Sequence, residues 1–196
     1  MATFEHISFQ QLGEGDLIDF LELSHHDKAK SLLKLMRRNF HSARSSNPKY
    51  KSLIQDITCL LEQIEVQINA LFSLETGSLF PFVRKLAEVS NYREPVRFLR
   101  VSLIESSIRR IREEHHHITA LLHSVRQLSN NFRPPADSTE ILKLGFAELN
   151  EFEELVSNQL FREQNILFPK ILQLEDEILH KSSIAATGTG GKGHDE

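Results

Sequence analysis

The sequence is poor in several features that would point to a function. Its 196 residues include a single cysteine, which excludes an internal disulfide framework and a cysteine-rich zinc site. Lys and Arg number 23 against 27 Asp and Glu, and this net charge of −4 lacks the basic surplus of nucleic-acid and anionic-membrane binders. No apolar run approaches the roughly 18 residues of a membrane-spanning helix, and the first residues lack the apolar core of a signal peptide. We therefore expect a cytoplasmic protein that binds neither nucleic acid nor a membrane.

Strand-like alternation is also absent, and helical periodicity dominates the chain. Four periodic stretches are separated by breaks rich in Gly, Pro, Ser and Asn, and they span about 16–43, 49–88, 104–132 and 137–180. Long helices with short connections predict an all-α, antiparallel four-helix bundle. We assign residues 1–181 to the bundle and 182–196 to a disordered Gly-rich tail, and leave the segment 93–103 unassigned.

Histidine is the residue type in clear surplus, with ten in the chain. Two of them fall on apolar stripes that should face the bundle core. His115 takes the position that the stripe of the third helix skips, and His25 lies at the centre of the stripe of the first helix. His26 is about 100° further round that helix, which places it near the edge of the stripe. The stripes of the second and fourth helices continue into Glu75 and Glu163.

Carboxylates on a core face need a partner, because Glu is almost never fully buried alone. An internal repeat adds to this pattern. Residues 75–81 (ETGSLFP) and 163–169 (EQNILFP) share Glu-x-x-x-Leu-Phe-Pro, and His25 and His115 have a similar separation. The repeat therefore predicts two similar helical hairpins, each contributing one His and one Glu to the interior.

No Gly-rich phosphate loop and no Ser-His-Asp or Cys-His arrangement is visible, so hydrolase and nucleotide chemistry lack support. The run His115–His116–His117 cannot converge on one ion, because consecutive helical residues point about 100° apart. We expect only its first member to face inward.

At these residues the chain resembles the hemerythrin-like (HHE cation-binding) superfamily, over about residues 16–173, and within it the bacterial iron-centre-repair proteins. The segments 108–137 and 163–169 carry the resemblance most firmly. It implies a hemerythrin-like bundle that holds one or two iron ions, with two Glu bridging the metals and His completing the coordination. On this resemblance the expected metal ligands are His25, Glu75, His115 and Glu163.

The chain departs from the family pattern at three expected histidines. Two of them are Leu71 and Gln159 here, and the third falls near Ser46, with no His in register. Leucine cannot bind a metal, and the glutamine offers only a neutral amide oxygen. The leading hypothesis is a non-haem iron-binding protein in iron-centre repair or in the response to oxygen or nitric oxide stress, rather than in substrate turnover. The alternative is a metal-free, degenerate bundle that acts as a protein-interaction or regulatory module, with its His and Glu side chains paired to each other. A protein partner is compatible with both hypotheses.

Overall fold

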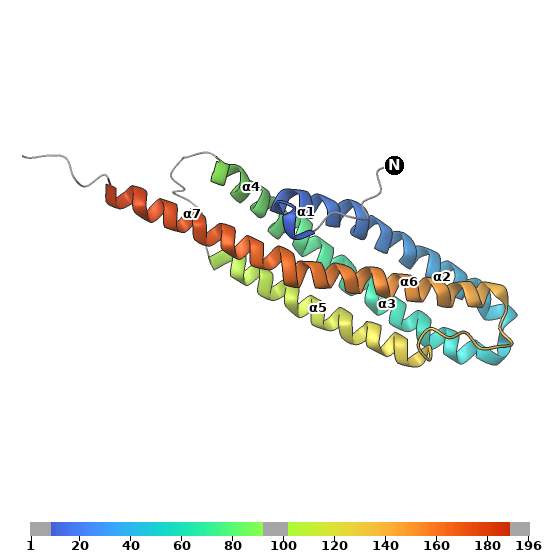
Figure 1. The fold of residues 1–196 in the computed structure, drawn as a ribbon. Helices are drawn as coiled ribbons and strands as arrows, with labels where there is room; N and C mark the ends of the chain where they lie inside the picture. Colours follow the sequence, from blue (N-terminus) through green and yellow to red (C-terminus); the bar gives the residue numbers. More distant parts are fainter. Residues whose placement is uncertain (1–8, 92–101, 189–196) are drawn as a thin grey trace, which may run out of the picture.

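The structure is a computed structural model that describes residues 9–91 and 102–188. Four helical rods run side by side and form an elongated bundle (Figure 1). The bundle confirms the predicted all-α fold, and no strand occurs within the two described ranges. In the same part of the chain, no helix is both long enough and apolar enough to cross a membrane.

Each rod except one consists of two α-helices joined by a wider turn. The α-helices are α1 (Glu14–Leu21), α2 (Asp27–Ser46), α3 (Lys51–Leu74), α4 (Phe80–Asn91), α5 (Ser102–Leu128), α6 (Glu140–Arg162) and α7 (Phe168–Gly188). The joining turns are π-helical and span Glu22–His26, Glu75–Leu79 and Glu163–Leu167. A π-turn holds one more residue than an α-turn and therefore shifts the helix face that follows it.

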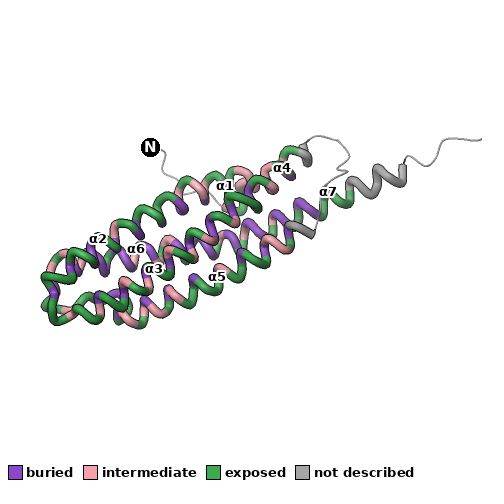
Figure 2. Tube along the Cα trace, turned by 180° about the vertical axis from the view of Figure 1, so that it is seen from behind, coloured by how far each residue is buried: buried purple, intermediate pink, exposed green. Residues whose placement is uncertain are grey.

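The buried residues lie along the inner sides of the four rods (Figure 2). The stripes predicted for the second, third and fourth helices are buried with few exceptions, from Ile57 to Leu71, from Ile104 to Val125 and from Leu149 to Gln159. Long-range contacts join α2 to α6 and α3 to both α2 and α5, as expected for an antiparallel bundle. Gly145 on α6 lets the Phe40 ring of α2 come close, since a Cβ at that glycine would lie 3.2 Å from the ring.

Several helix ends differ from the sequence-based boundaries. The third helix ends at Leu128 rather than at Phe132, because Asn130, Asn131 and Phe132 adopt left-handed φ angles of 50°, 56° and 59°. The fourth begins at Glu140, after Thr139, rather than at about residue 137. At the far end, α7 continues to Gly188, past the predicted tail boundary at residue 181. Most of the unassigned segment 93–103, and residues 189–196 of the tail, lie outside the described residues.

Candidate metal centre

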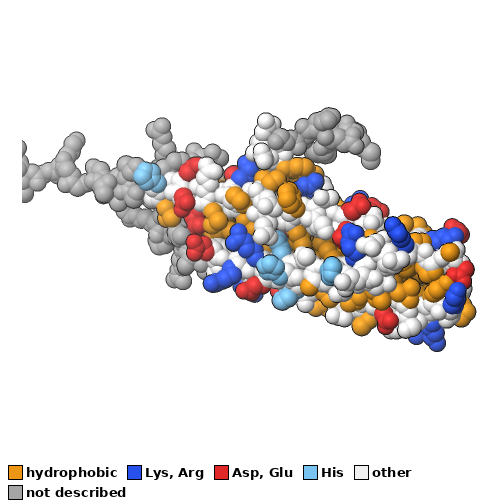
Figure 3. All heavy atoms as spheres, turned by 60° about the horizontal axis from the view of Figure 1, so that its bottom comes forward, with side chains coloured by type: hydrophobic (Ala, Val, Ile, Leu, Met, Phe, Trp, Pro, Cys, Tyr) orange, Lys and Arg blue, Asp and Glu red, His pale blue; other side chains and the backbone are white. Residues whose placement is uncertain are grey.

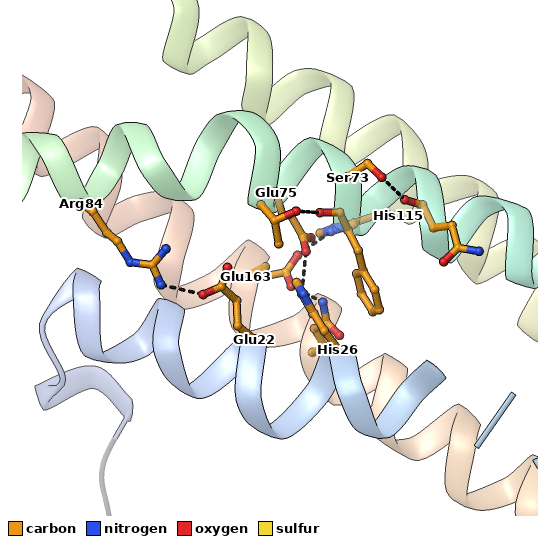
Figure 4. A network of polar contacts seen from close by, with 11 residues as sticks. Glu22, His26, Ser73, Glu75, Arg84, His115 and Glu163 are labelled. Carbon is orange, nitrogen blue, oxygen red and sulfur yellow. Dashed lines mark hydrogen bonds and ion pairs between the residues drawn. The ribbon is translucent and has the colours of Figure 1, made fainter. Parts of the chain in front are cut away.

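The polar side chains that interrupt the core come together around the π-turns. Figure 4 shows His26, Glu75, His115 and Glu163 pointing toward one another from different rods. All four are buried, with exposed fractions between 0% and 4%. The structure thus brings together three of the four residues predicted from the sequence, and His26 stands where His25 was expected.

Two His–Glu contacts form the heart of this cluster. His26 Nε2 lies 2.8 Å from Glu75 Oε2, and His115 Nε2 lies 2.8 Å from Glu163 Oε2. His26, Glu75 and Glu163 each offer one potential metal-ligand atom. These three atoms lie within 4.8 Å of one another, a spacing that a single metal ion can bridge. Within the described ranges, no other group of His, Cys, Asp and Glu side chains reaches this convergence.

The two halves of the cluster are built alike. Glu75 and Glu163 each open a π-turn that ends in the repeated Leu-Phe-Pro segment. The rings of that segment pack on the histidines, Phe80 against His26 at 5.9 Å and Phe168 against His115 at 5.8 Å between centroids, both with nearly parallel planes. The internal repeat therefore produces the pseudo-symmetry that the sequence predicts, with one His, one Glu and one Phe from each half.

His25 occupies a different place, and this corrects the sequence-based geometry. Its side chain is also buried, at 4% exposed, but its Nε2 lies 2.6 Å from Nη1 of Arg162 and its ring meets Phe20 edge-on. His26 is instead stacked on Phe72 at 3.7 Å and faces the carboxylates. Of the two adjacent histidines, only His26 belongs to the cluster.

The cause is the π-turn Glu22–His26. In an unbroken α-helix, His25 follows Leu21 by four residues and shares its face. The wide turn inserts one residue, so that His26 takes this place. The sequence contains one signal for His26, which is the apolar stripe that follows it. The buried residues of this stripe repeat at intervals of three and four from His26: Ala29, Leu33, Met36, Phe40 and Ala43.

The electrostatic environment favours the uncharged forms of Glu75 and His26. Burial, and next the negative charge of Glu163, raise the pKa of Glu75 well above its usual range. Burial lowers the pKa of His26 from 6.5 to about 4, against the opposing influence of Glu163. A cation between the two carboxyl groups would oppose the repulsion between them and favour the ionised form of Glu75.

The hydrogen bonding of Glu75 shows that these residues suit a cation. Neither of its oxygens accepts a hydrogen bond from a nitrogen or hydroxyl donor within the described part of the chain, and the approach of His26 lacks hydrogen-bond geometry. The side-chain hydrogen bond that Glu75 shares with the carboxyl group of Glu163 requires a proton on one of the two groups. By contrast, the buried Glu148 accepts hydrogen bonds at 2.7 and 2.9 Å from Asn39 Nδ2. Buried carboxylate oxygens without donors are costly, and a bound metal ion would satisfy them. The donor set of imidazole and carboxylate matches non-haem iron and related divalent ions.

Comparison with known proteins places this centre in a family. The model of the hemerythrin HHE cation-binding domain matches residues 17–171, a range that contains the whole cluster and most of all four rods. The chain belongs to the hemerythrin HHE cation-binding domain family. This hemerythrin domain is also similar to a protein of Haemophilus influenzae described as a "Probable iron-sulfur cluster repair protein", with 25% identity over 150 residues. The matched region covers 76% of this chain but 59% of that relative, so the relative is considerably longer.

The hemerythrin domain lacks imidazoles at two equivalent positions beside its carboxylates. Leu71 and Gln159 precede Glu75 and Glu163 by four residues each, and both are buried, at 0% and 1% exposed. Leu71 adds apolar surface next to Glu75. Gln159 Nε2 donates a hydrogen bond of 2.7 Å to Glu163 Oε1, which leaves that carboxylate better satisfied than Glu75.

The remaining histidines that the structure describes lie away from the centre. His116, His117 and His123 on α5 are exposed, as are His41 and His180. In Figure 3, where the underside of the bundle comes forward, histidine side chains lie at the surface. The prediction that only the first member of the run 115–117 points inward is confirmed.

Proposed function

We propose that this hemerythrin domain binds iron between His26, Glu75, His115 and Glu163, and that it serves in iron handling, as in the repair of iron–sulfur clusters or the response to oxygen and nitric oxide stress. The observation that carries the proposal is the pair of fully buried carboxyl groups of Glu75 and Glu163, of which Glu75 has no nitrogen or hydroxyl hydrogen-bond donor among the described residues and shares a hydrogen bond with Glu163 instead. Imidazole nitrogens and carboxylate oxygens together are a ligand set that suits iron. The similarity to a described iron–sulfur cluster repair protein supports the physiological part of the proposal.

Iron would supply the redox and ligand-binding chemistry, and the chain supplies a dry and rigid cage. Glu75 and Glu163 would offer carboxylate oxygens, while His26 and His115 would offer imidazole nitrogens on rings that pack against Phe80 and Phe168. Because Leu71 and Gln159 bring no imidazole, the chain provides fewer nitrogen ligands than a complete hemerythrin centre. Open positions on the metal suit the binding of a small diatomic molecule or the transfer of iron.

The second candidate function is a metal-free bundle that acts through protein interactions. The contacts of Glu163 favour it, because Gln159 and His115 already satisfy its two oxygens. In that case the His–Glu pairs would serve as buried polar contacts that define the packing of the rods.

Metal binding by the intact chain separates the two candidates. We expect the protein purified without oxygen to take up ferrous iron, and a free iron concentration of about 100 times Kd to stabilise the fold by about 2.7 kcal/mol. For a chain of this size that corresponds to a rise in Tm of roughly 5–10 °C. Metal analysis and thermal melts with and without iron measure both quantities.

Single substitutions test the ligand assignment in the same assay. His26→Ala should remove most of the iron-dependent rise in Tm, whereas His25→Ala should keep it, since His25 faces Arg162. His116→Ala, at an exposed position on α5, is the matched control. Iron content near zero in the unchanged protein, with no shift of Tm, would exclude the iron proposal and favour the metal-free bundle.

Restoring the missing imidazoles should strengthen binding. The double variant Leu71→His, Gln159→His places a nitrogen ligand four residues before each carboxylate. We expect an increase in iron affinity at least as large as the roughly 10-fold contributed by outer-shell partners in metal sites, or an increase in the number of iron ions bound per chain. Gln159→Leu is the control, because it removes the hydrogen bond to Glu163 without adding a ligand. Unchanged iron binding in the double variant would show that the cage, not the ligand count, limits the site.

A further inference from the structure

The chain carries two adjacent buried histidines, and only one of them faces the metal centre. His26 lies 2.8 Å from Glu75, while His25 lies 2.6 Å from Arg162. Contacts around this pair select which histidine faces the carboxylates, and the role of that selection in metal binding rests on the proposed function.

The first rod has two available registers around this position. In the register of the structure, the π-turn Glu22–His26 precedes the inward histidine, which is His26. If the rod were α-helical from Leu21 to His26 and the wide turn came after these residues, His25 would follow Leu21 on the inner face and His26 would move to the edge. The two registers differ only in where the single wide turn lies, so contacts outside the rod must decide between them.

The contacts of Arg162 favour the observed register. The guanidinium lies over the rings of Phe9 and Phe20, 4.2 and 5.4 Å from their centroids. A guanidinium can only donate hydrogen bonds, so the 2.6 Å contact requires His25 Nε2 to accept one and to carry no proton. Arg162 also directly precedes Glu163 in the chain, so the segment that supplies a carboxylate to the centre also supplies the partner of His25.

The opposite end of the π-turn is held as well. Arg84 on α4 contacts Glu22, the first residue of the turn, at 2.6 Å (Figure 4). It also contacts Asp19 on α1, at 2.5 Å. The turn is therefore held by Arg84 at its start and by Arg162 at its end. Since the Arg162 contact is made to one of the two histidines, it can distinguish between them.

We infer that Arg162 is a positioning residue that holds His25 outside the metal centre through the Arg162–His25 contact and thereby makes His26 the histidine that faces Glu75 and Glu163. Without this contact, the wide turn can move along the rod and His25 becomes available to the carboxylates.

A double-mutant cycle with cobalt(II), which gives a spectroscopic signal on binding, tests the inference. In the unchanged background, His26→Ala should lower cobalt affinity by about 10-fold or more. In the Arg162→Met background the same substitution should cost less than about 3-fold, because His25 replaces His26. In the Arg162→Lys background, which keeps a charged donor, His26→Ala should again cause the full loss of cobalt affinity. Arg126→Met is the matched control, because Arg126 is also an arginine stacked on a ring, that of Phe132 at 4.9 Å.

A metal-free measurement keeps this test independent of the proposed function. In the chain with Arg162, NMR of the imidazole nitrogens should show His25 neutral with its proton on Nδ1. In Arg162→Met, His26→Ala, the His25 ring should give NOE contacts to Phe72, the ring that now stacks on His26. Equal losses of cobalt affinity in the unchanged and Arg162→Met backgrounds, or the absence of these NOE contacts in the folded double variant, would overturn the inference. Failure of the unchanged protein to bind cobalt or iron would instead overturn the proposed function, and the NMR result would still decide the role of Arg162.

Discussion

Replacing Glu75 by glutamine is expected to stabilise the metal-free protein and, in the same variant, to remove its response to iron. Burial and the charge of Glu163 raise the pKa of Glu75, so the native state holds a proton that the unfolded chain releases near pH 4.5. Above that pH the native state binds more protons than the unfolded state, and stability falls as pH rises. Glutamine has the same shape and does not titrate, so the Glu75→Gln variant should not show this loss of stability at higher pH.

The gain from Glu75→Gln should therefore be small at pH 5 and larger at pH 8. Each 1 kcal/mol corresponds to about 2–4 °C in Tm for a chain of this length, and we expect a rise of several degrees at pH 8. Thermal melts across this pH range, each with and without iron, measure both effects. A Glu75→Gln variant that is less stable than the parent at pH 8, or that keeps the full iron shift, would contradict the prediction.

Glu163→Gln is the matched comparison because the repeat places it in the equivalent position. Glu163 accepts hydrogen bonds from Gln159 Nε2 at 2.7 Å and from His115 Nε2 at 2.8 Å. Substitution disrupts contacts that are already satisfied, so we expect a loss of about 1–3 kcal/mol in the metal-free protein. The two equivalent substitutions should thus have opposite signs without iron, and both should reduce the iron response.

Stability at acid pH should depend strongly on His25. Burial, and next the positive charge of Arg162, lower its pKa from 6.5 to about 4. Between these values the unfolded chain binds a proton that the native chain does not, so stability rises as pH increases from about 4 to 6.5. A pKa difference of this size in one group corresponds to about 3 kcal/mol in the free energy of unfolding, or roughly 6–12 °C in Tm. His26, whose pKa is also lowered to about 4, contributes with the same sign.

The variant His25→Gln isolates this contribution. The glutamine oxygen can still accept a hydrogen bond from Arg162, but the side chain does not titrate. We expect the rise in Tm between pH 4 and pH 6.5 to be smaller in His25→Gln than in the unchanged chain. His116→Gln, at an exposed position, should leave the slope unchanged. Parallel curves for His25→Gln and the unchanged protein would show that the buried His25 does not have the lowered pKa.

Much of the fold and part of the centre could be predicted from the sequence. Glu75, His115 and Glu163 fall on apolar stripes with an uninterrupted α-helical period before them, so counting by 3.6 residues finds their inward direction. The repeat of Glu-x-x-x-Leu-Phe-Pro also predicted the equivalence of the two carboxylates. The same counting placed His25 instead of His26 inward, because a π-turn interrupts the first rod at the site itself.

The amino-acid sequence by itself determined the four-rod bundle, the two carboxylates and one histidine of the centre, because hydrophobic periodicity decides which helix face is buried. The tertiary structure alone decided which of the two adjacent histidines faces them, and that Glu75 finds no nitrogen or hydroxyl donor within the described residues and shares a hydrogen bond with Glu163 instead. The physical reason is that one extra residue in a helix can be absorbed by a wide turn at several neighbouring places with similar local geometry. Contacts from the other rods, namely Phe72 stacked on His26, Arg84 on Glu22 and Arg162 on His25, determine the place that is used.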